Sequence, residues 1–401
     1  MSHNGPARPG VAVGGLAFGR LFKLLNEFKN FTQLFEIYDF YMRLRAVELV
    51  TLATLLLGGA LAAQQAPRFE VDPGFPKPLP EGWINATLGH PCVDAHDHIV
   101  IVDRQNITEE EAETSMPTRP ILMFDLDGNL VASWGEADRV PASIHGCGFD
   151  ADNNIWVVGN ADGIAQKYSH SGELLVQIGT RGLLDTHDGT AVRAADNTIN
   201  REPLNSSHDR FFFPAGVAVD PDNGDLYVAD GYGNKRVAVF DETGRFLRQW
   251  GRQATPAETR AGTGGVFTYA LHCVVISNAG LVYVCDREGL RVQVFDKTGN
   301  FIRNIWVKTG NATLPDSRGT VWGIAFSPDE AQQFLYVLDG RHEQVHVLDH
   351  ASGEILSSFG RPGHQLGNFT VAHGIAADSR GNLYVAESGT GRRVQRFTPS
   401  N

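Results

Sequence analysis

Six copies of one sequence pattern repeat along this chain of 401 residues. Each copy has a few small or apolar residues, then an Asp or Ser that opens a turn, then a β-rich run. The copies are GHPCVDAHDHIVIVDR, IHGCGFDADNNIWVVGN, PAGVAVDPDNGDLYVADG, LHCVVISNAGLVYVCDR, VWGIAFSPDEAQQFLYVLDG and AHGIAADSRGNLYVAES. Their turns lie about 50 to 70 residues apart, which is the spacing of four-stranded blades. We therefore predict an all-β fold, a six-bladed β-propeller.

Most copies continue with two further strands. RVAVFDETGRFLRQWG, RVQVFDKTGNFIRNIW and EQVHVLDHASGEILSSFG alternate apolar and polar residues with the period of a strand. The D-x-T-G and similar tetrapeptides between the runs supply hairpin turns. The last copy stops after RRVQRFT and lacks a fourth strand of its own. We expect the segment around Phe69 to Val71 to supply that strand and close the ring.

The N-terminal region has the pattern of an export signal. Met42-Arg-Leu-Arg precedes an apolar stretch that ends in small residues near Ala62 and Ala63, as in a secretory signal peptide over residues 42–63. The stretch is short for a membrane span. We expect a propeller over residues 64–401 that is secreted or periplasmic and has no stable membrane association after signal removal. Residues 1–41 are then a non-native extension, the alternative being an amphipathic anchoring helix.

The overall charge excludes one class of partner. The formal net charge is −12 at pH 7, and the acidic residues are spread along the chain. Nucleic-acid binding requires a basic surface stripe. We therefore expect no nucleic-acid partner.

The four cysteines lack metal-binding spacing. None of Cys92, Cys147, Cys273 and Cys285 forms a C-x-x-C pair. We interpret them as small buried residues. Disulfides are permitted in an exported protein, and a Cys273 to Cys285 pair is the alternative, because both fall on neighbouring strands of one blade.

Three histidines occupy the same position in alternate copies of the repeat. His145, His272 and His373 each lie five residues before the turn residue in the second, fourth and sixth copies, where the other copies have glycine, alanine or tryptophan. A single histidine here is usually just packed or hydrogen-bonded. The innermost strand of each blade lines the central channel, however, so histidines from alternate blades converge on the axis. Three imidazoles suit Zn²⁺ and leave a fourth position open, as in catalytic sites.

The residues expected around that position favour an anionic substrate. Arg104 and Arg287 each lie ten residues after the turn residue of their copies, at the end of the second strand, and Tyr232 follows the equivalent point in the third copy. Arginine binds carboxylates through two parallel hydrogen bonds. A cation beside a phenol favours the phenolate, which can act as a base. Asn234 and Arg236 fit ordinary turn positions, and we interpret them as structural.

The repeats resemble NHL repeats, and the chain is similar to peptidyl-α-hydroxyglycine α-amidating lyase. The motif DGYGNKR, the segments LHCVVIS and CDREGLRVQVF, and IHGCGFD and AHGIAAD carry the resemblance, which extends over residues 85 to 397. It implies that His145, His272 and His373 bind zinc. The family's catalytic tyrosine matches Tyr232, and its two active-site arginines match Arg287 and Arg104, although the residues flanking Arg104 differ.

Two positions depart from the family pattern. Family members have an aspartate directly after the third zinc histidine, which helps to hold a structural calcium, and this chain has Gly374. Only backbone carbonyls near Val93 and Cys147 remain as candidate Ca²⁺ ligands. The family also has a cysteine where this chain has Gly233, so that disulfide is absent.

The resemblance implies a lyase that cleaves the N–Cα bond of a C-terminal α-hydroxyglycine and releases a peptide amide and glyoxylate. A related carbinolamide is an alternative substrate. A noncatalytic propeller that binds a protein, peptide or glycan is the rival hypothesis, but such a module has no reason to place histidine in alternate blades. A lactonase-type propeller is a third, although those enzymes hold calcium with Glu, Asn and Asp on the axis.

Overall fold

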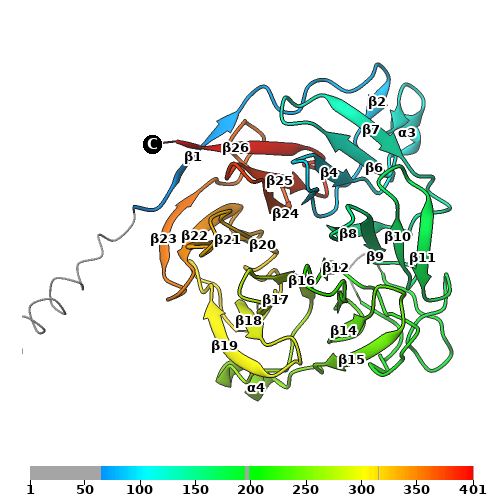
Figure 1. The fold of residues 1–401 in the computed structure, drawn as a ribbon, viewed down its shortest axis with the longest axis vertical. Helices are drawn as coiled ribbons and strands as arrows, with labels where there is room; N and C mark the ends of the chain where they lie inside the picture. Colours follow the sequence, from blue (N-terminus) through cyan, green and yellow to red (C-terminus); the bar gives the residue numbers. More distant parts are fainter. Residues whose placement is uncertain (1–64, 195–197, 315, 401) are drawn as a thin grey trace, which may run out of the picture. The chain divides into compact units, whose positions relative to one another are not determined.

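The computed structural model describes residues 65–194, 198–314 and 316–400. Six four-stranded antiparallel sheets surround a common centre, so the fold is the predicted six-bladed β-propeller (Figure 1). The region from Ala66 onward forms one compact unit. No helix in these described ranges is both long and apolar enough to span a membrane.

The blades follow one another along the chain. The first contains β3 (Cys92–Val93), β4 (Ile99–Val102), β6 (Ile121–Phe124) and β7 (Leu130–Trp134). The second contains β8 (Ile144–Phe149), β9 (Ile155–Gly159), β10 (Ala165–Tyr168) and β11 (Leu174–Ile178). The third contains β12 (Gly216–Val219), β13 (Leu226–Asp230), β14 (Arg236–Phe240) and β15 (Phe246–Trp250). The fourth contains β16 (Leu271–Ile276), β17 (Val282–Asp286), β18 (Arg291–Phe295) and β19 (Phe301–Trp306). The fifth contains β20 (Gly323–Phe326), β21 (Phe334–Asp339), β22 (Gln344–Asp349) and β23 (Ile355–Phe359).

The sixth blade is shared by the two ends of the described chain. It contains β24 (Ala372–Ala377), β25 (Leu383–Glu387), β26 (Val394–Ser400) and, as its outer strand, β1 (Arg68–Asp72). Phe69 pairs with Pro399 and Val71 with Phe397 in the antiparallel register, and β1 and β26 lie side by side in Figure 1. The predicted closure of the ring by this segment is therefore confirmed.

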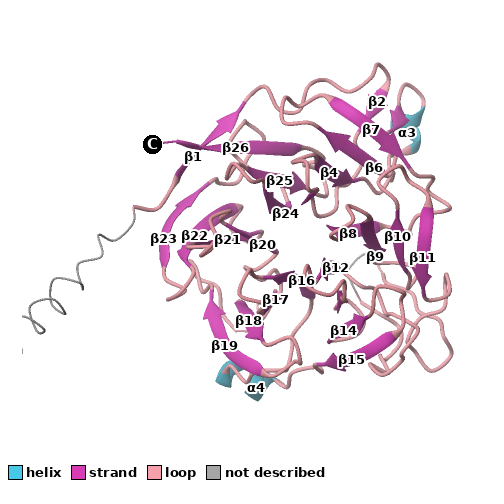
Figure 2. Cartoon of the chain, in the orientation of Figure 1, coloured by secondary structure: helices cyan, strands magenta, loops and turns pink. Residues whose placement is uncertain are grey.

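A few short elements lie outside the blades (Figure 2). β2 (Trp83–Ile84) and β5 (Met116–Pro117) form a small parallel pair. The described part of the chain contains two short helices, α3 (Glu109–Ala112) and α4 (Pro256–Ala261), and each is capped at its N-terminus by a threonine. The acidic residues of α3 form a single helical turn with no buried residue.

The hydrophobic core lies between neighbouring blades. Second strands such as β13 and β17 are buried at every residue because another blade covers each of their faces, whereas the outer strands β15 and β19 are only partly buried. Cys285 and Val292 of the fourth blade, for example, share one cluster with Phe326 and Val337 of the fifth. The six inner strands contact each other in cyclic order, which places their side chains around the axis.

Repeated polar contacts fix the turns and the blade entrances. In the D-E-T-G turn of the third blade, the Asp241 carboxylate accepts the backbone N–H groups of Thr243 and Arg245, and Gly244 adopts a φ of 87° that favours glycine. At the end of β13 the Asp230 carboxylate accepts the Phe212 N–H and pairs with fully buried Arg236 at 3.0 Å. The structural interpretation of Arg236 agrees with these contacts.

The interpretation of the cysteines as unpaired is wrong, because all four form disulfides. Cys273 and Cys285 join neighbouring strands of the fourth blade, as in the alternative that the sequence left open. Cys92 and Cys147 join the inner strands of the first and second blades, a pair that the sequence did not indicate. The predicted signal peptide and the segment before it lie outside the described residues and stay predictions.

Candidate metal centre

The three axial histidines lie on the inner strands β8, β16 and β24 and are almost fully buried. At each of them the pairing with the second strand skips: between Ile144 and Gly146, between Leu271 and Val274, and between Ala372 and Gly374. The inner strands β12 and β20, which have no histidine, begin only at Gly216 and Gly323, one residue after the axial position, so their ladders do not extend over it. A bulge re-aims a side chain, so the bulges turn the histidines toward the axis.

The blades without histidine orient two of these imidazoles. His145 Nδ1 donates to the Ala215 carbonyl at 2.7 Å and His272 Nδ1 donates to the Trp322 carbonyl at 2.5 Å. In the third and fifth copies, Ala215 and Trp322 occupy the position that is equivalent to the axial histidines. A carbonyl can only accept, so each ring carries its proton on Nδ1 and presents the Nε2 lone pair to the centre. Metal-ligating histidines are typically fixed in this way.

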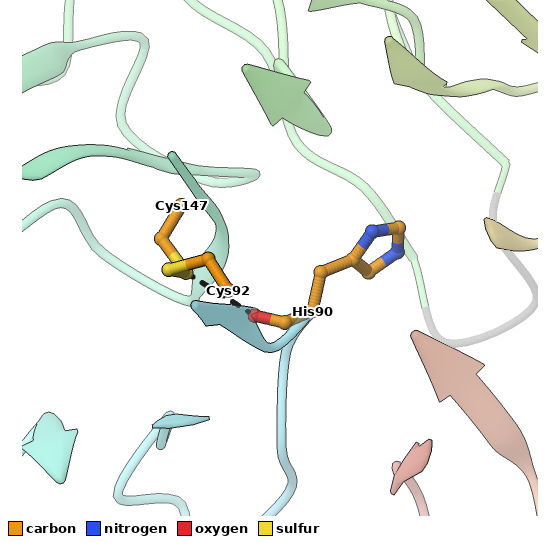
Figure 3. Close-up of a disulfide and its surroundings, with 3 residues drawn as sticks. All are labelled: His90, Cys92 and Cys147. Atoms are coloured by element: carbon orange, nitrogen blue, oxygen red, sulfur yellow. Dashed lines mark hydrogen bonds between the residues drawn. A yellow bond between two sulfur atoms is a disulfide. The ribbon is translucent and has the colours of Figure 1, made fainter. Parts of the chain in front are cut away.

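A fourth histidine, His90 of the first blade, joins the cluster. The rings of His90, His145, His272 and His373 offer nitrogen atoms that all lie within 4.8 Å of one another. Figure 3 shows the His90 ring extending away from the Cys92–Cys147 disulfide, and the His90 carbonyl oxygen lies 3.5 Å from Cys147 Sγ. His90 was not predicted from the sequence, because in the first copy the position equivalent to the three histidines is Gly89, one residue earlier.

Burial keeps all four imidazoles neutral. It lowers the pKa of His145, His272 and His373 well below the usual value, and the neighbouring histidines and arginines add to the effect. The pKa of His90 is lowered to about 3, first by burial and then by the charge of Arg104. Neutral imidazoles keep the lone pairs that a metal requires.

Tyr232 follows β13 and reaches the same centre. Its hydroxyl lies 3.1 Å from His145 Nε2 and 2.9 Å from His272 Nε2. Both nitrogens carry lone pairs, but the hydroxyl has one proton and can donate to only one of them at a time. The remaining lone pair is buried without a donor, a costly arrangement that a cation in the cluster would relieve. The residues present therefore fit a metal such as Zn²⁺.

Three arginines surround Tyr232 in a cavity of about 290 Å³ that His373 also lines. Arg193 lies over the Tyr232 ring at 4.8 Å, and Arg287 lies over Trp322 at 4.7 Å. Burial lowers the pKa of Arg104 to about 10, so it stays charged at neutral pH. The structure thus brings Tyr232, Arg104 and Arg287 together beside the histidines, as the sequence indicated.

Arg193 and Trp322 were not identified as lining residues from the sequence. Arg193 comes from the long connection between the second and third copies, whose turns are 70 residues apart instead of about 50 to 57. That excess length was the available signal, since long loops often carry binding residues. Trp322 was noted only as the axial residue of the fifth copy, and its role as a stacking partner of Arg287 depends on a contact between blades.

His90 and Pro91 fill the space that a side chain at position 374 would need. A Cβ atom on Gly374 would lie 2.6 Å from His90 Cα and 2.8 Å from Pro91 Cδ. An aspartate at this position would therefore collide with the first blade. Calcium binding through backbone carbonyls stays a prediction.

A second cluster lies away from the axis, where Asp94, His98 and His170 approach one another. Asp94 Oδ2 accepts from His98 Nδ1 at 2.9 Å and from His170 Nε2 at 2.8 Å. The carboxylate is satisfied by these hydrogen bonds, and the two ring centroids are 6.0 Å apart. This cluster is complete without an ion, in contrast to the axial one.

Comparison with known proteins agrees with this architecture. The NHL repeat family matches residues 211–240 and 268–295. Peptidyl-glycine alpha-amidating monooxygenase B of Xenopus laevis is 32% identical over 203 residues, which are 49% of this chain and 21% of that protein. Peptidyl-alpha-hydroxyglycine alpha-amidating lyase 1 of Drosophila melanogaster is 28% identical over 202 residues, 47% of this chain and 35% of the fly protein. The chain thus spans about a fifth to a third of these relatives.

Another relative matches over most of both chains. NHL repeat-containing protein 3 of Homo sapiens is 26% identical over 345 residues, 83% of this chain and 85% of the human protein. A solved structure of a protein of unknown function from Bacteroides thetaiotaomicron aligns over 84% of this chain and 77% of that one, with a TM-score of 0.53 and 13% identity, and supports the fold alone. The chain is an NHL-repeat propeller that resembles the amidating lyase.

Proposed function

We propose that this protein is a zinc-dependent lyase that cleaves the N–Cα bond of a peptidyl-α-hydroxyglycine, or of a related carbinolamide, to an amide and glyoxylate. The observation that carries the proposal is the position of Tyr232. Its hydroxyl contacts two axial histidines at 2.9 and 3.1 Å, while Arg193 and Arg287 flank its ring in one cavity. The lyase names of the relatives support the same reaction.

Zn²⁺ bound by the histidines would act as a Lewis acid that lowers the pKa of the substrate hydroxyl. Tyr232, acting as the phenolate, takes the hydroxyl proton on Oη. The hydroxyl oxygen then becomes the aldehyde oxygen of glyoxylate, the N–Cα bond breaks, and its electron pair moves to the nitrogen. Tyr232 returns the proton to that nitrogen, which completes a primary amide. Atoms and charge balance without any further reactant.

The arginines hold the terminal carboxylate that becomes the carboxylate of glyoxylate. Arg287 Nε is buried and has no hydrogen-bond partner among the described residues, so it is available to a ligand. The cavity of about 290 Å³ is at the lower end of the range for small-molecule sites. It therefore suits the terminal hydroxyglycine unit and leaves the rest of a peptide outside.

Export to the periplasm or beyond is part of the proposal. The predicted signal peptide over residues 42–63 motivates it. The two disulfides support it, because such bonds persist mainly in oxidising compartments. Immunoblotting of cytoplasmic and exported fractions tests it, and a protein found only in the cytoplasm would contradict export.

The decisive experiment measures glyoxylate released from α-hydroxyhippurate by the purified full chain, loaded with zinc. Replacing Tyr232 by Phe is expected to lower kcat by about 10² to 10⁴, the usual contribution of a general base. Replacing Arg287 by Ala is expected to raise KM. Tyr227→Phe is the matched control, since this buried tyrosine lies on β13 and bonds to Arg248, away from the histidines.

A noncatalytic binding propeller is the second candidate. The observation in its favour is the human relative that matches over 83% of this chain and whose name states a repeat and no activity. Metal-loaded wild-type protein that releases no glyoxylate, and gives no amide from a peptidyl-α-hydroxyglycine, would refute the lyase and leave this candidate.

A further inference from the structure

We propose that the metal ion is held by four histidines, and that His90 is the fourth ligand. This inference rests on the metal site of the proposed function but not on the reaction. The six distances between the four ring centroids are nearly equal. His90 lies 5.1, 4.9 and 5.0 Å from His145, His272 and His373, and those three lie 5.0, 4.6 and 5.1 Å from one another.

Six nearly equal distances between four points define a tetrahedron. In a regular tetrahedron with edges of about 5 Å, the centre lies about 3 Å from each ring centroid. An imidazole nitrogen lies about 1.1 Å from the centroid of its ring, so a nitrogen that points inward would be about 2 Å from the centre. This distance is close to the 2.0–2.1 Å of zinc–imidazole bonds. Zinc prefers this geometry when four protein ligands are present. The cluster therefore has both the shape and the size of a tetrahedral zinc site.

The polar atoms of the cluster are consistent with this assignment. His90 Nε2 and His373 Nδ1 are buried and make no hydrogen bond to any described residue. Buried polar atoms are almost always paired. His145 and His272 present Nε2 lone pairs, because their Nδ1 atoms donate to carbonyls. An ion at the centre would satisfy nitrogens that the protein leaves without a donor.

His90 closes the site from the side opposite to Tyr232. It lines a small cavity of about 70 Å³ in the channel together with Pro91 and Gly146, whereas Tyr232 lines the arginine cavity. The backbone N–H of His90 donates to the His145 carbonyl at 2.7 Å, which anchors the segment against the second blade. The substrate side of the site therefore stays with Tyr232, and His90 completes the other side. With four imidazoles bound, the substrate hydroxyl of the proposed reaction would add on the Tyr232 side as a fifth ligand, a coordination number that catalytic zinc can reach.

Gly374 makes room for His90. A Cβ atom on this glycine would lie 2.6 Å from His90 Cα and 2.9 Å from His90 Cγ. The absence of a side chain at position 374 and the position of His90 therefore depend on each other in this chain. Where the resembled family uses a carboxylate, this chain uses the space for a fourth imidazole.

X-ray absorption at the zinc edge of the full chain, stripped with chelator and reloaded with one equivalent of zinc, tests the assignment without a variant. The expected spectrum fits four imidazoles. In His90→Ala it should fit three imidazoles and one oxygen, and the affinity for zinc, from competition with a chromophoric chelator, should fall at least tenfold. Co²⁺ substitution gives an independent readout, since the visible spectrum is sensitive to the ligand set.

His170→Ala is the matched control, because this histidine belongs to the Asp94 cluster. It should leave the spectrum and the affinity unchanged. Three imidazoles in the wild type, or equal affinities for wild type and His90→Ala, would overturn the inference even if glyoxylate is released. Four imidazoles without glyoxylate release would support the inference and refute the lyase.

Discussion

Replacing Gly374 by alanine tests whether this position and His90 share one space. The new Cβ would lie 2.6 Å from His90 Cα, 2.8 Å from Pro91 Cδ and 2.9 Å from His90 Cγ. Ordinary contacts begin at about 3.4 Å, so the first blade must move away by roughly half an ångström to one ångström. Overpacking of this kind costs about 1–3 kcal/mol. We expect the free energy of unfolding without metal to fall by that amount.

The metal adds a second, separable effect. A ligand that binds only the folded state stabilises it by RT ln(1 + [L]/Kd), about 2.7 kcal/mol at a hundredfold excess over Kd. If Gly374→Ala displaces His90 and weakens zinc binding tenfold, about 1.4 kcal/mol of this stabilisation is lost. Urea unfolding followed by tryptophan fluorescence, once with chelator and once with zinc, measures both effects.

Gly323 provides the matched control. It lies on the inner strand of the fifth blade, after the axial Trp322, and a Cβ there would meet the Ile375 side chain at 3.3 Å. Neither glycine has a positive φ, so alanine fits both backbones. We expect Gly323→Ala to cost less than about 1 kcal/mol, as for a small adjustment of side chains. Equal effects of the two substitutions, with and without zinc, would refute the reasoning.

Three further changes address the fold and its titration. Replacing Cys92 and Cys147 by alanine removes a disulfide that closes a loop with a sequence separation of 55 residues, and should lower the free energy of unfolding by about 4 kcal/mol; an unchanged urea midpoint would contradict this. Phe69→Ala should lower the free energy of unfolding by about 1–3 kcal/mol, because this half-buried ring holds β1 against the core. A decrease of less than about 0.5 kcal/mol, as for a neutral surface substitution, would show that β1 is dispensable. Burial raises the pKa of Glu288 from 4.5 to about 7, against the opposing charge of Arg287. The stability linked to the protonated carboxyl is therefore complete below pH 4.5 and is lost as the pH rises to 7; Glu288→Gln should flatten urea midpoints over this range, and a slope equal to that of the wild type would refute the shift.

The ring and its axial histidines could be predicted because both depend on local signals. Strand period and turn residues recur in every copy, and an inner strand must face the axis once six blades close. The register skips at the three histidines were not predicted from the sequence, although Gly146 and Gly374 directly follow two of the histidines and a glycine inside a strand can mark a bulge. These skips depend on pairing with the second strand, which the composition of the inner strand does not determine.

The parts of the site that depend on contacts between distant segments were harder to predict from the sequence. Arg193 reaches Tyr232 from a loop, and a loop conformation has no period that a sequence pattern could indicate. The stacking of Arg287 on Trp322 joins two blades, so it depends on how the blades pack. The convergence of Arg104, Arg287 and Tyr232 was predictable only because all three lie near the ends of second strands, which meet on one face of the ring.

His90 and the Cys92–Cys147 disulfide were missed for one common reason. His145 and Cys147 lie five and three residues before the turn residue of the second copy, whereas His90 and Cys92 lie four and two residues before that of the first. The first copy therefore has one residue fewer, and alignment on the turn displaced both side chains by one position. Alignment on the tripeptide H-x-C places the two cysteines opposite each other, where they pair.

The shorter first copy also explains how its histidine reaches the axis. Pro91 has no N–H to donate, and β3 begins only at Cys92, whereas the Gly89 N–H still donates to the Val102 carbonyl of β4 at 2.9 Å, so the blade's own ladder is interrupted at His90 and Pro91. His90 bonds instead to the carbonyl of His145 in the second blade. Such a displaced segment requires an empty space on the sixth blade, which only a glycine at position 374 leaves. A related chain with an aspartate there is thus expected to lack the fourth histidine, and a chain with H-P-C in its first copy is expected to have the glycine.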